Sequence, residues 1–181
     1  VVPNGPELAA CFLALTNRVT YAPLDTHLTE AQFRFEFADL PAKMIIVQAG
    51  QESNVQVLRI AAEMDIPVLT LTPDVEIVGL FTLHAADGSS GDSDAEDCWA
   101  RRDDLALVLH TSGTTNKPKI VPLTHENICV GALCIKSTLQ LTPEDRCINI
   151  MPLYHIHGLI VNVLVSTFTG SSTICTLGHH A

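Results

Sequence analysis

The 181-residue sequence contains no hydrophobic run long enough to cross a membrane. The best candidate, residues 159–168, is much shorter than the roughly 20 residues that a spanning helix needs. The N-terminal residues also lack the basic stretch followed by an apolar one that marks a secretory signal. We therefore expect no membrane span and a cytoplasmic protein, with the peroxisome as the alternative location.

Basic residues are scarce. Ten Lys and Arg residues stand against twenty Asp and Glu, so the formal net charge is −10. Binding to DNA or RNA requires clustered lysines and arginines, and this charge balance argues against a nucleic-acid partner. A single nucleotide remains compatible, because a few backbone N–H groups and one or two lysines can hold a triphosphate.

Signatures of disulfide frameworks and metal sites are also missing. The cysteines form no C-x-x-C pair and show no metal-ligand spacing. Most stand in apolar surroundings, which predicts buried free thiols in a reducing compartment. The six residues concerned are Cys11, Cys98, Cys129, Cys134, Cys147 and Cys175.

Apolar residues, by contrast, make up 47% of the chain, which is enough for a substantial core. Helical and strand patterns alternate, and this predicts an α/β fold in which helices cover both faces of a parallel sheet. Asn4 and Thr124 are the expected helix caps. Helices are expected over residues 6–16, 29–40, 54–64, 124–139 and 157–168, and strands over 19–21, 44–47, 67–71, 105–109, 120–123, 146–151 and 172–175.

Residues 72–104 break this alternation, and we expect irregular chain there. Asp87–Asp94 reads DGSSGDSD, which is small, polar and acidic. Such a composition is typical of a solvated surface loop, here spanning about residues 85–104, and shows no ligand spacing for a cation.

The clearest chemistry lies in a hydroxyl-rich segment directly after the apolar run Leu105–Leu109. Gly113 lets the backbone approach a ligand closely, and Pro118 stiffens the turn. Open α/β sheets bind ligands at the carboxyl ends of their strands, so this turn is expected to hold a polyphosphate. The expected phosphate-binding residues are Thr111, Ser112, Gly113, Thr114, Thr115, Lys117 and Lys119.

Competing motifs are not found. A Walker A loop would need a second glycine followed by Lys-Ser or Lys-Thr, and no G-x-S-x-G elbow occurs. A general NTPase or kinase is therefore disfavoured. His155 and His157 form an H-x-H pair, but no further ligand stands at a suitable spacing for a metal site.

Residues 111–120 resemble the phosphate-binding signature T-S-G-[ST]-T-G-x-P-K-G of the adenylate-forming superfamily, which includes acyl-CoA synthetases, luciferases and adenylation domains of peptide synthetases. The chain departs from it at Asn116 and Ile120, where the family usually has glycine. Met151–Gly158 (MPLYHIHG) resembles a second family motif, P-[LM]-[FY]-H-x-x-G. The resemblance covers nearly the whole chain in the correct order, and it is strongest to the branch of oxalate–CoA ligases.

The resemblance implies a two-step reaction with ATP, Mg²⁺ and coenzyme A, of the kind used in fatty acid metabolism. A carboxylate attacks the α-phosphorus of ATP, which gives an acyl-adenylate and pyrophosphate, and the thiol of coenzyme A then takes the acyl group. The resemblance also implies a metal ion near Thr115. It assigns Tyr154, His155 and Gly158 to the acyl pocket, with His157 as a weaker candidate.

The same resemblance makes residues 1–181 part of an N-terminal AMP-binding domain, with its phosphate loop at 111–119. The C-terminal domain with the catalytic lysine would then lie outside the sequence, so no catalytic residue is expected within it, and the chain alone is expected to be inactive. The expected partners are a small carboxylic acid, ATP, coenzyme A and the missing region of the same enzyme.

Two alternatives stay open. In one, the activated acyl group is delivered to a carrier-protein thiol rather than to coenzyme A. In the other, the chain is a non-catalytic remnant that binds nucleotide or a partner, which the departures at Asn116 and Ile120 favour.

Overall fold

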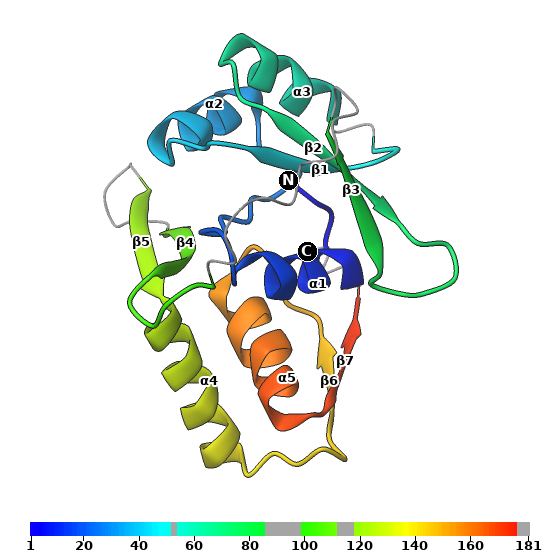
Figure 1. The fold of residues 1–181 in the computed structure, drawn as a ribbon, viewed down its shortest axis with the longest axis vertical. Coiled ribbons are helices and arrows are strands. Elements are labelled where there is room, and N and C mark those ends of the chain that lie inside the picture. The colour runs from blue at the N-terminus through cyan, green and yellow to red at the C-terminus, as the bar shows by residue number, and fades with distance from the viewer. Residues whose placement is uncertain (52–53, 86–98, 112–117, 177–181) are drawn as a thin grey trace. The chain divides into compact units, whose positions relative to one another are not determined.

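The structure, a computed structural model, describes residues 1–51, 54–85, 99–111 and 118–176 (Figure 1). The chain divides into two compact units. Unit 1 consists of Val1–Pro3 and Leu24–Ala95, and unit 2 of Asn4–Pro23 and Glu96–Ala181.

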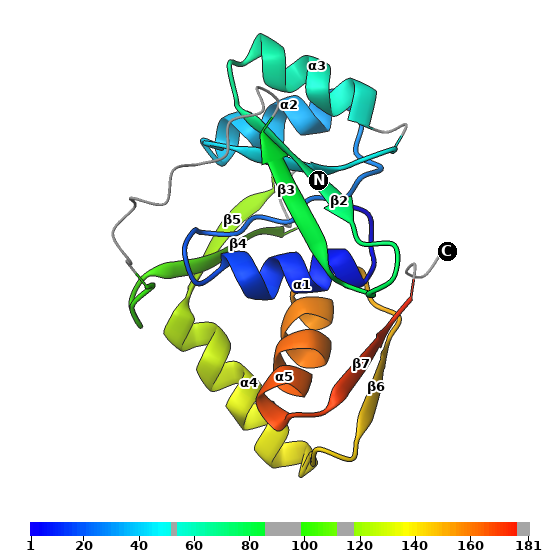
Figure 2. The same cartoon turned by 45° about the vertical axis from the view of Figure 1, so that its right-hand side comes forward.

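Unit 1 is a small sheet with two helices. Strand β1 pairs in parallel with β2, and β2 pairs antiparallel with β3. Helices α2 and α3 lie next to each other on one face of this sheet in both views (Figure 1 and Figure 2). The elements are α2 (Glu30–Asp39), β1 (Ile45–Gln48), α3 (Asn54–Glu63), β2 (Val68–Pro73) and β3 (Phe81–Ala85).

Helix α2 forms for reasons that are visible in the sequence. The Thr29 hydroxyl accepts the Gln32 N–H at 3.4 Å, and the Gln32 side chain accepts the Thr29 N–H at 2.8 Å. This reciprocal cap satisfies donors at the helix start. Phe33 and Phe37, one turn apart, place their ring centroids 5.7 Å from each other in the core of unit 1. The predicted helix over residues 29–40 is confirmed.

Strand β3 forms where irregular chain was expected, so the prediction for residues 72–104 is wrong at Phe81–Ala85. More and less exposed residues alternate along β3, but the pattern is too short to stand out in the sequence. Asp74 stabilises the turn before β3, because its carboxylate accepts the N–H groups of Glu76 and Ile77, both at 2.8 Å.

Unit 2 contains two further sheets within the described residues. Strands β4 and β5 form an antiparallel hairpin, and β6 pairs in parallel with β7. Helices α4 and α5 pack against each other (Figure 2). The elements are α1 (Pro6–Leu15), β4 (Leu105–Thr111), β5 (Lys119–Thr124), α4 (His125–Leu139), β6 (Arg146–Asn149), the π-helix η1 (His157–Leu164), α5 (Val165–Thr169) and β7 (Ser172–Cys175).

The predicted α/β class is confirmed, with sheets that mix parallel and antiparallel pairs. The pairs β1–β2 and β6–β7 are parallel, as predicted, whereas β2–β3 and β4–β5 are antiparallel. The strand expected over residues 19–21 is reduced to a single bridge between Tyr21 and Leu107. No helix in the described ranges is long and apolar enough to span a membrane.

The two predicted caps have different outcomes. Thr124 caps α4 as expected, because its hydroxyl accepts the Asn127 N–H at 3.2 Å and the Asn127 amide accepts the Thr124 N–H at 3.0 Å. The prediction for Asn4 is wrong, since α1 begins after Gly5 without a side-chain cap. Asn4 instead binds backbone groups far along the chain.

The expectation that the cysteines are buried is also corrected. Among the described cysteines, Cys11 is buried, whereas Cys134 is exposed and the others are half-buried. Burial raises the pKa of the Cys11 thiol.

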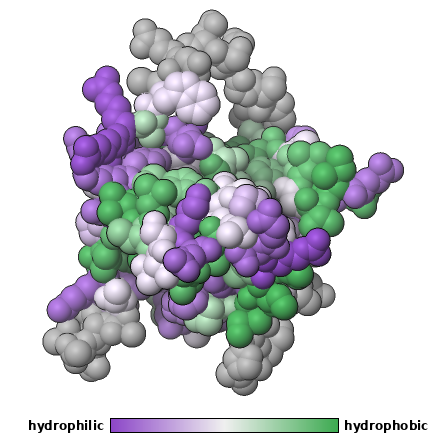
Figure 3. Space-filling model, turned by 90° about the horizontal axis from the view of Figure 1, so that it is seen from below, coloured by the Kyte–Doolittle hydropathy of each residue, from purple (hydrophilic) through white to green (hydrophobic). Residues whose placement is uncertain are grey.

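Several hydrophobic side chains are exposed, among them Val130 and Leu133 on α4. The face in Figure 3 shows hydrophobic groups separated by hydrophilic ones.

Candidate functional site

The predicted phosphate loop connects β4 to β5. Thr111 at the end of β4 is paired with Lys119 at the start of β5, and the Thr111 hydroxyl donates to the Lys119 carbonyl at 3.5 Å. Both residues are exposed. The structure therefore brings these two predicted residues together. Ser112, Gly113, Thr114, Thr115 and Lys117 lie outside the described residues, and their roles, including a metal near Thr115, stay predictions.

The hairpin that carries this loop is anchored on one side. Ala106, Leu107 and Leu109 of β4 are buried in unit 2, whereas the end of the hairpin is exposed. Ile120 pairs with His110 inside the hairpin. A β-branched residue is well suited to a strand, so the family's usual glycine is not needed at this position for the hairpin to form.

The MPLYHIHG segment follows β6 and leads into η1. Two asparagine side chains hold its backbone. One belongs to Asn149 on the preceding strand, and the other to Asn4, which is distant in sequence. Asn149 Oδ1 accepts the Met151 N–H at 3.2 Å, and Asn4 Oδ1 accepts the Leu153 N–H at 2.7 Å. Asn4 Nδ2 also donates to the Thr176 carbonyl at 2.9 Å, which ties the segment to the chain after β7.

Asn149 is fully buried at the end of β6 and binds a second asparagine on η1. Asn162 Nδ2 donates to Asn149 Oδ1 at 2.7 Å, and the Thr173 hydroxyl donates to the Asn162 carbonyl at 3.1 Å. Asn149 Nδ2 has no hydrogen-bond partner among the described residues. Sequence reasoning missed this pair; its signal was an asparagine within each of two otherwise apolar stretches.

Gly158 occupies a position that has no space for a side chain. A Cβ atom there would lie 2.6 Å from the Pro152 carbonyl oxygen and 3.2 Å from that of Met151. The same Pro152 carbonyl accepts the His155 N–H at 3.2 Å. Gly158 therefore allows the start of η1 to pack directly on the segment before it, which is a structural reason for the last glycine of the motif.

The side chains of Tyr154 and His155 contact each other within the MPLYHIHG segment. Their ring centroids are 4.8 Å apart, Tyr154 is half-buried and His155 is exposed. Neither they nor Gly158 line the pocket found beside η1, whereas His157, the weaker candidate, does. Their role in an acyl site stays a prediction.

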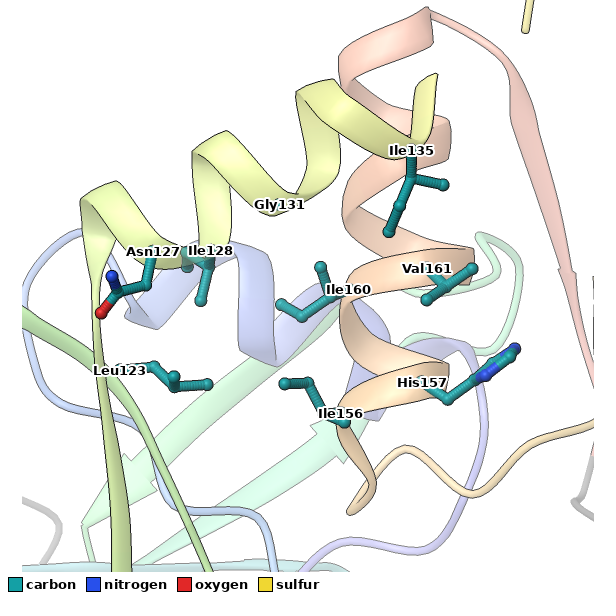
Figure 4. A pocket seen from close by; sticks show the side chains of 9 residues that line it. All are labelled: Leu123, Asn127, Ile128, Gly131, Ile135, Ile156, His157, Ile160 and Val161. Atoms are coloured by element: carbon teal, nitrogen blue, oxygen red, sulfur yellow. The ribbon is translucent and has the colours of Figure 1, made fainter. Parts of the chain in front are cut away.

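This pocket, of about 290 Å³, lies between α4 and η1, next to the end of β5 (Figure 4). Asn127 and His157 are its polar lining residues and lie at opposite ends of it in Figure 4. Aliphatic residues and one glycine form the remainder: Leu123, Ile128, Gly131, Ile135, Ile156, Ile160 and Val161.

Residues 1–181 match the family described as AMP-binding enzyme. The chain is 34% identical over 171 residues to an oxalate–CoA ligase from Arabidopsis thaliana, which covers 94% of this chain and 33% of that protein. It is 36% identical over 197 residues to an oxalate–CoA ligase from Saccharomyces cerevisiae, covering 98% of this chain and 36% of that protein.

Among solved structures, the chain is similar to ATP-bound MatB from Rhodopseudomonas palustris. The TM-score is 0.69 at 32% identity, over 89% of this chain and 31% of that one. The chain therefore spans about a third of the length of the relatives that it matches.

Proposed function

Because the chain belongs to the family of AMP-binding enzymes, we propose that it is part of an acyl-CoA ligase, which activates a carboxylic acid with ATP and transfers the acyl group to coenzyme A. The observation that carries the proposal is the β4–β5 hairpin, which holds both ends of the signature segment, Thr111 and Lys119, together at an exposed edge of unit 2. In this proposal the chain binds the phosphates of ATP.

The hairpin suits this task because one of its strands is fixed and its end is accessible. The buried residues of β4 restrain the base, so the ends of the loop need little ordering when a ligand binds. The exposed Lys119 ammonium is available to a phosphate oxygen. Its charge reduces the repulsion that a carboxylate meets on approaching a polyanionic nucleotide.

The remaining assignments follow from family membership and complete the proposal. Mg²⁺, bound near Thr115 with the phosphates, would supply further neutralisation of their charge. Tyr154 and His155 would face the acid, and coenzyme A would be the acceptor. The catalytic lysine belongs to a region outside these residues, and the compartment we propose is the cytoplasm.

Calorimetry with Mg-ATP on the 181-residue chain tests the proposal. We expect saturable binding that Lys119→Ala weakens about tenfold, the usual size for losing one charge-assisted contact. Lys43→Ala, an exposed lysine of unit 1, is the matched control and should leave binding unchanged. No binding at millimolar ATP, or equal binding by the Lys119 variant, would overturn the proposal in favour of a non-catalytic remnant.

A further inference from the structure

Strand β3 forms one edge of the three-stranded sheet of unit 1, and among the described residues its outer side pairs with no other strand (Figure 2). An open edge presents unpaired N–H and C=O groups to any extended segment that approaches it. Natural edge strands usually carry a lysine, a proline or a bulge that prevents such pairing. Strand β3, which reads FTLHA and is described in full, contains none of these, and its register with β2 is regular.

The hydrogen bonds of the β2–β3 hairpin determine which backbone groups face the open edge. The Asp74 N–H donates to the Leu80 carbonyl at 2.8 Å, next to the first pair of the ladder. Hydrogen-bonded and non-hydrogen-bonded pairs alternate along an antiparallel ladder, so Thr82 and His84 are the residues of β3 that bond to β2. The other residues of β3 point their N–H and C=O groups toward the open edge: Phe81, Leu83 and Ala85. Pro73, which has no N–H, lies opposite the first of these, as the alternation requires.

The side chains of β3 are arranged so that the strand can pair with a copy of itself. Thr82 and His84 are exposed, whereas Phe81, Leu83 and Ala85 are half-buried. In an antiparallel pair of β3 strands with Leu83 at the two-fold axis, Phe81 lies beside Ala85 of the second copy and Thr82 beside its His84. Apolar side chains then meet apolar ones on one face of the sheet, and polar side chains meet polar ones on the other.

We propose that the chain forms a two-fold symmetric dimer through its β3 strands, which join the two three-stranded sheets into one continuous sheet. The register that matches the side chains also places the outward N–H and C=O groups of the two strands opposite each other, so both requirements have the same solution. An interface of this kind uses the same patch on both copies, as two-fold symmetry demands. The inference goes beyond the proposed function and does not depend on it.

The charge of the chain favours contact at this edge. The formal net charge is −10, so two copies repel each other when they approach. Strand β3 contains no acidic residue, and the repulsion between facing groups is therefore smallest there. Asp74 and Glu76 in the preceding turn still contribute to it, and added salt should strengthen the dimer by screening their charge.

The turn before β3 adds an apolar surface at each end of the paired strands. Val75 and Val78 are 97% and 81% exposed, and Ile77 and Leu80 are exposed as well. The carboxylate of Asp74 orders this turn through its two backbone hydrogen bonds, so association would cost little further ordering. A group of exposed aliphatic side chains is typical of an interaction surface, and here it is continuous with the open edge.

Analytical ultracentrifugation of the 181-residue chain at micromolar concentrations tests the dimer. We expect a reversible equilibrium between monomer and dimer that shifts toward the dimer as salt is added. Leu83→Lys places like charges directly opposite each other at the two-fold axis and should weaken dimerisation by about tenfold or more. Thr72→Lys, the matched control, makes the same charge change at an exposed position of β2 and should leave dimerisation unchanged.

Amide hydrogen exchange of the parent chain gives a second measurement that requires no variant. Where the dimer predominates, the outward N–H groups of Phe81, Leu83 and Ala85 should gain protection, whereas those of Thr82 and His84 should be protected at every concentration. A chain that stays monomeric, or a dimer in which the outward amides exchange as fast as in the monomer, would overturn the inference. Equal weakening of the dimer by Leu83→Lys and Thr72→Lys would overturn it as well.

Discussion

At the scale of single residues, Gly158 and Gly131 differ in what surrounds them. We expect Gly158→Ala to destabilise the chain by about 1–3 kcal/mol, because its Cβ would lie 2.6 Å from a backbone oxygen that has little freedom to move. Gly131→Ala, in open space on α4, should stabilise it by about 0.5–1 kcal/mol through helix propensity. Chemical denaturation of both variants measures the difference, and equal effects would contradict this reading.

The buried asparagine pair gives a second prediction at this scale. Asn149→Leu removes the acceptor of both the Met151 N–H and the Asn162 amide, and should cost about 1–3 kcal/mol. The double variant Asn149→Leu/Asn162→Leu should cost less than the sum of the two single variants, because no side-chain amide is then left without its partner. Denaturant titration of all four proteins tests this coupling, and strict additivity would show that the amides do not act as a pair.

At the scale of elements, an ion-pair network links α2 and α3. Glu30 accepts hydrogen bonds from Arg59 at 2.5 Å and from Arg34 at 3.0 Å, and Arg34 and Arg59 also pair with Glu63. Arg59 first, and then Arg34, lower the pKa of Glu30 below its usual value of 4.5. The ionised Glu30 carboxylate therefore stabilises the folded state at pH values above 4.5. This stabilisation is lost as the pH falls through the lowered pKa of Glu30 in the folded state.

We accordingly expect Glu30→Gln to be less stable than the parent chain at pH 7, with a difference that shrinks as the pH falls below 4.5. Added salt should also reduce the difference, because the network is exposed. Glu144→Gln, at an exposed glutamate with no ion pair in the described residues, is the control. A stability difference that stays constant from pH 7 to pH 3 would contradict the assignment.

The β4–β5 hairpin shows how an element relates to its sequence. The strand character of Leu105–Leu109 and of residues 120–123 is local and was predictable. That these two strands pair with each other, with Thr111 opposite Lys119, depends on contacts across the loop and could only be seen in the structure.

At the scale of the whole molecule, the chain covers about a third of its relatives. We expect the isolated 181-residue chain to release no pyrophosphate above background when given ATP, Mg²⁺ and a panel of carboxylic acids. The physical reason is that holding phosphates supplies only part of the transition-state stabilisation, and the family resemblance implies a catalytic lysine outside these residues. A coupled pyrophosphate assay measures this, and turnover that Lys119→Ala abolishes would place catalysis within the chain.

The sequence by itself determined the family and most of the elements, with β3 and the strand expected over residues 19–21 as exceptions. Capping residues such as Thr29 and Thr124 act on neighbours three positions away, and the signature at 111–119 is contiguous, so both can be read from a short window. Only the tertiary structure decided which distant groups meet: Asn4 with Leu153, Asn149 with Asn162, and the aliphatic residues of α4 with those of η1. Such contacts depend on how the elements pack, and no local pattern encodes that.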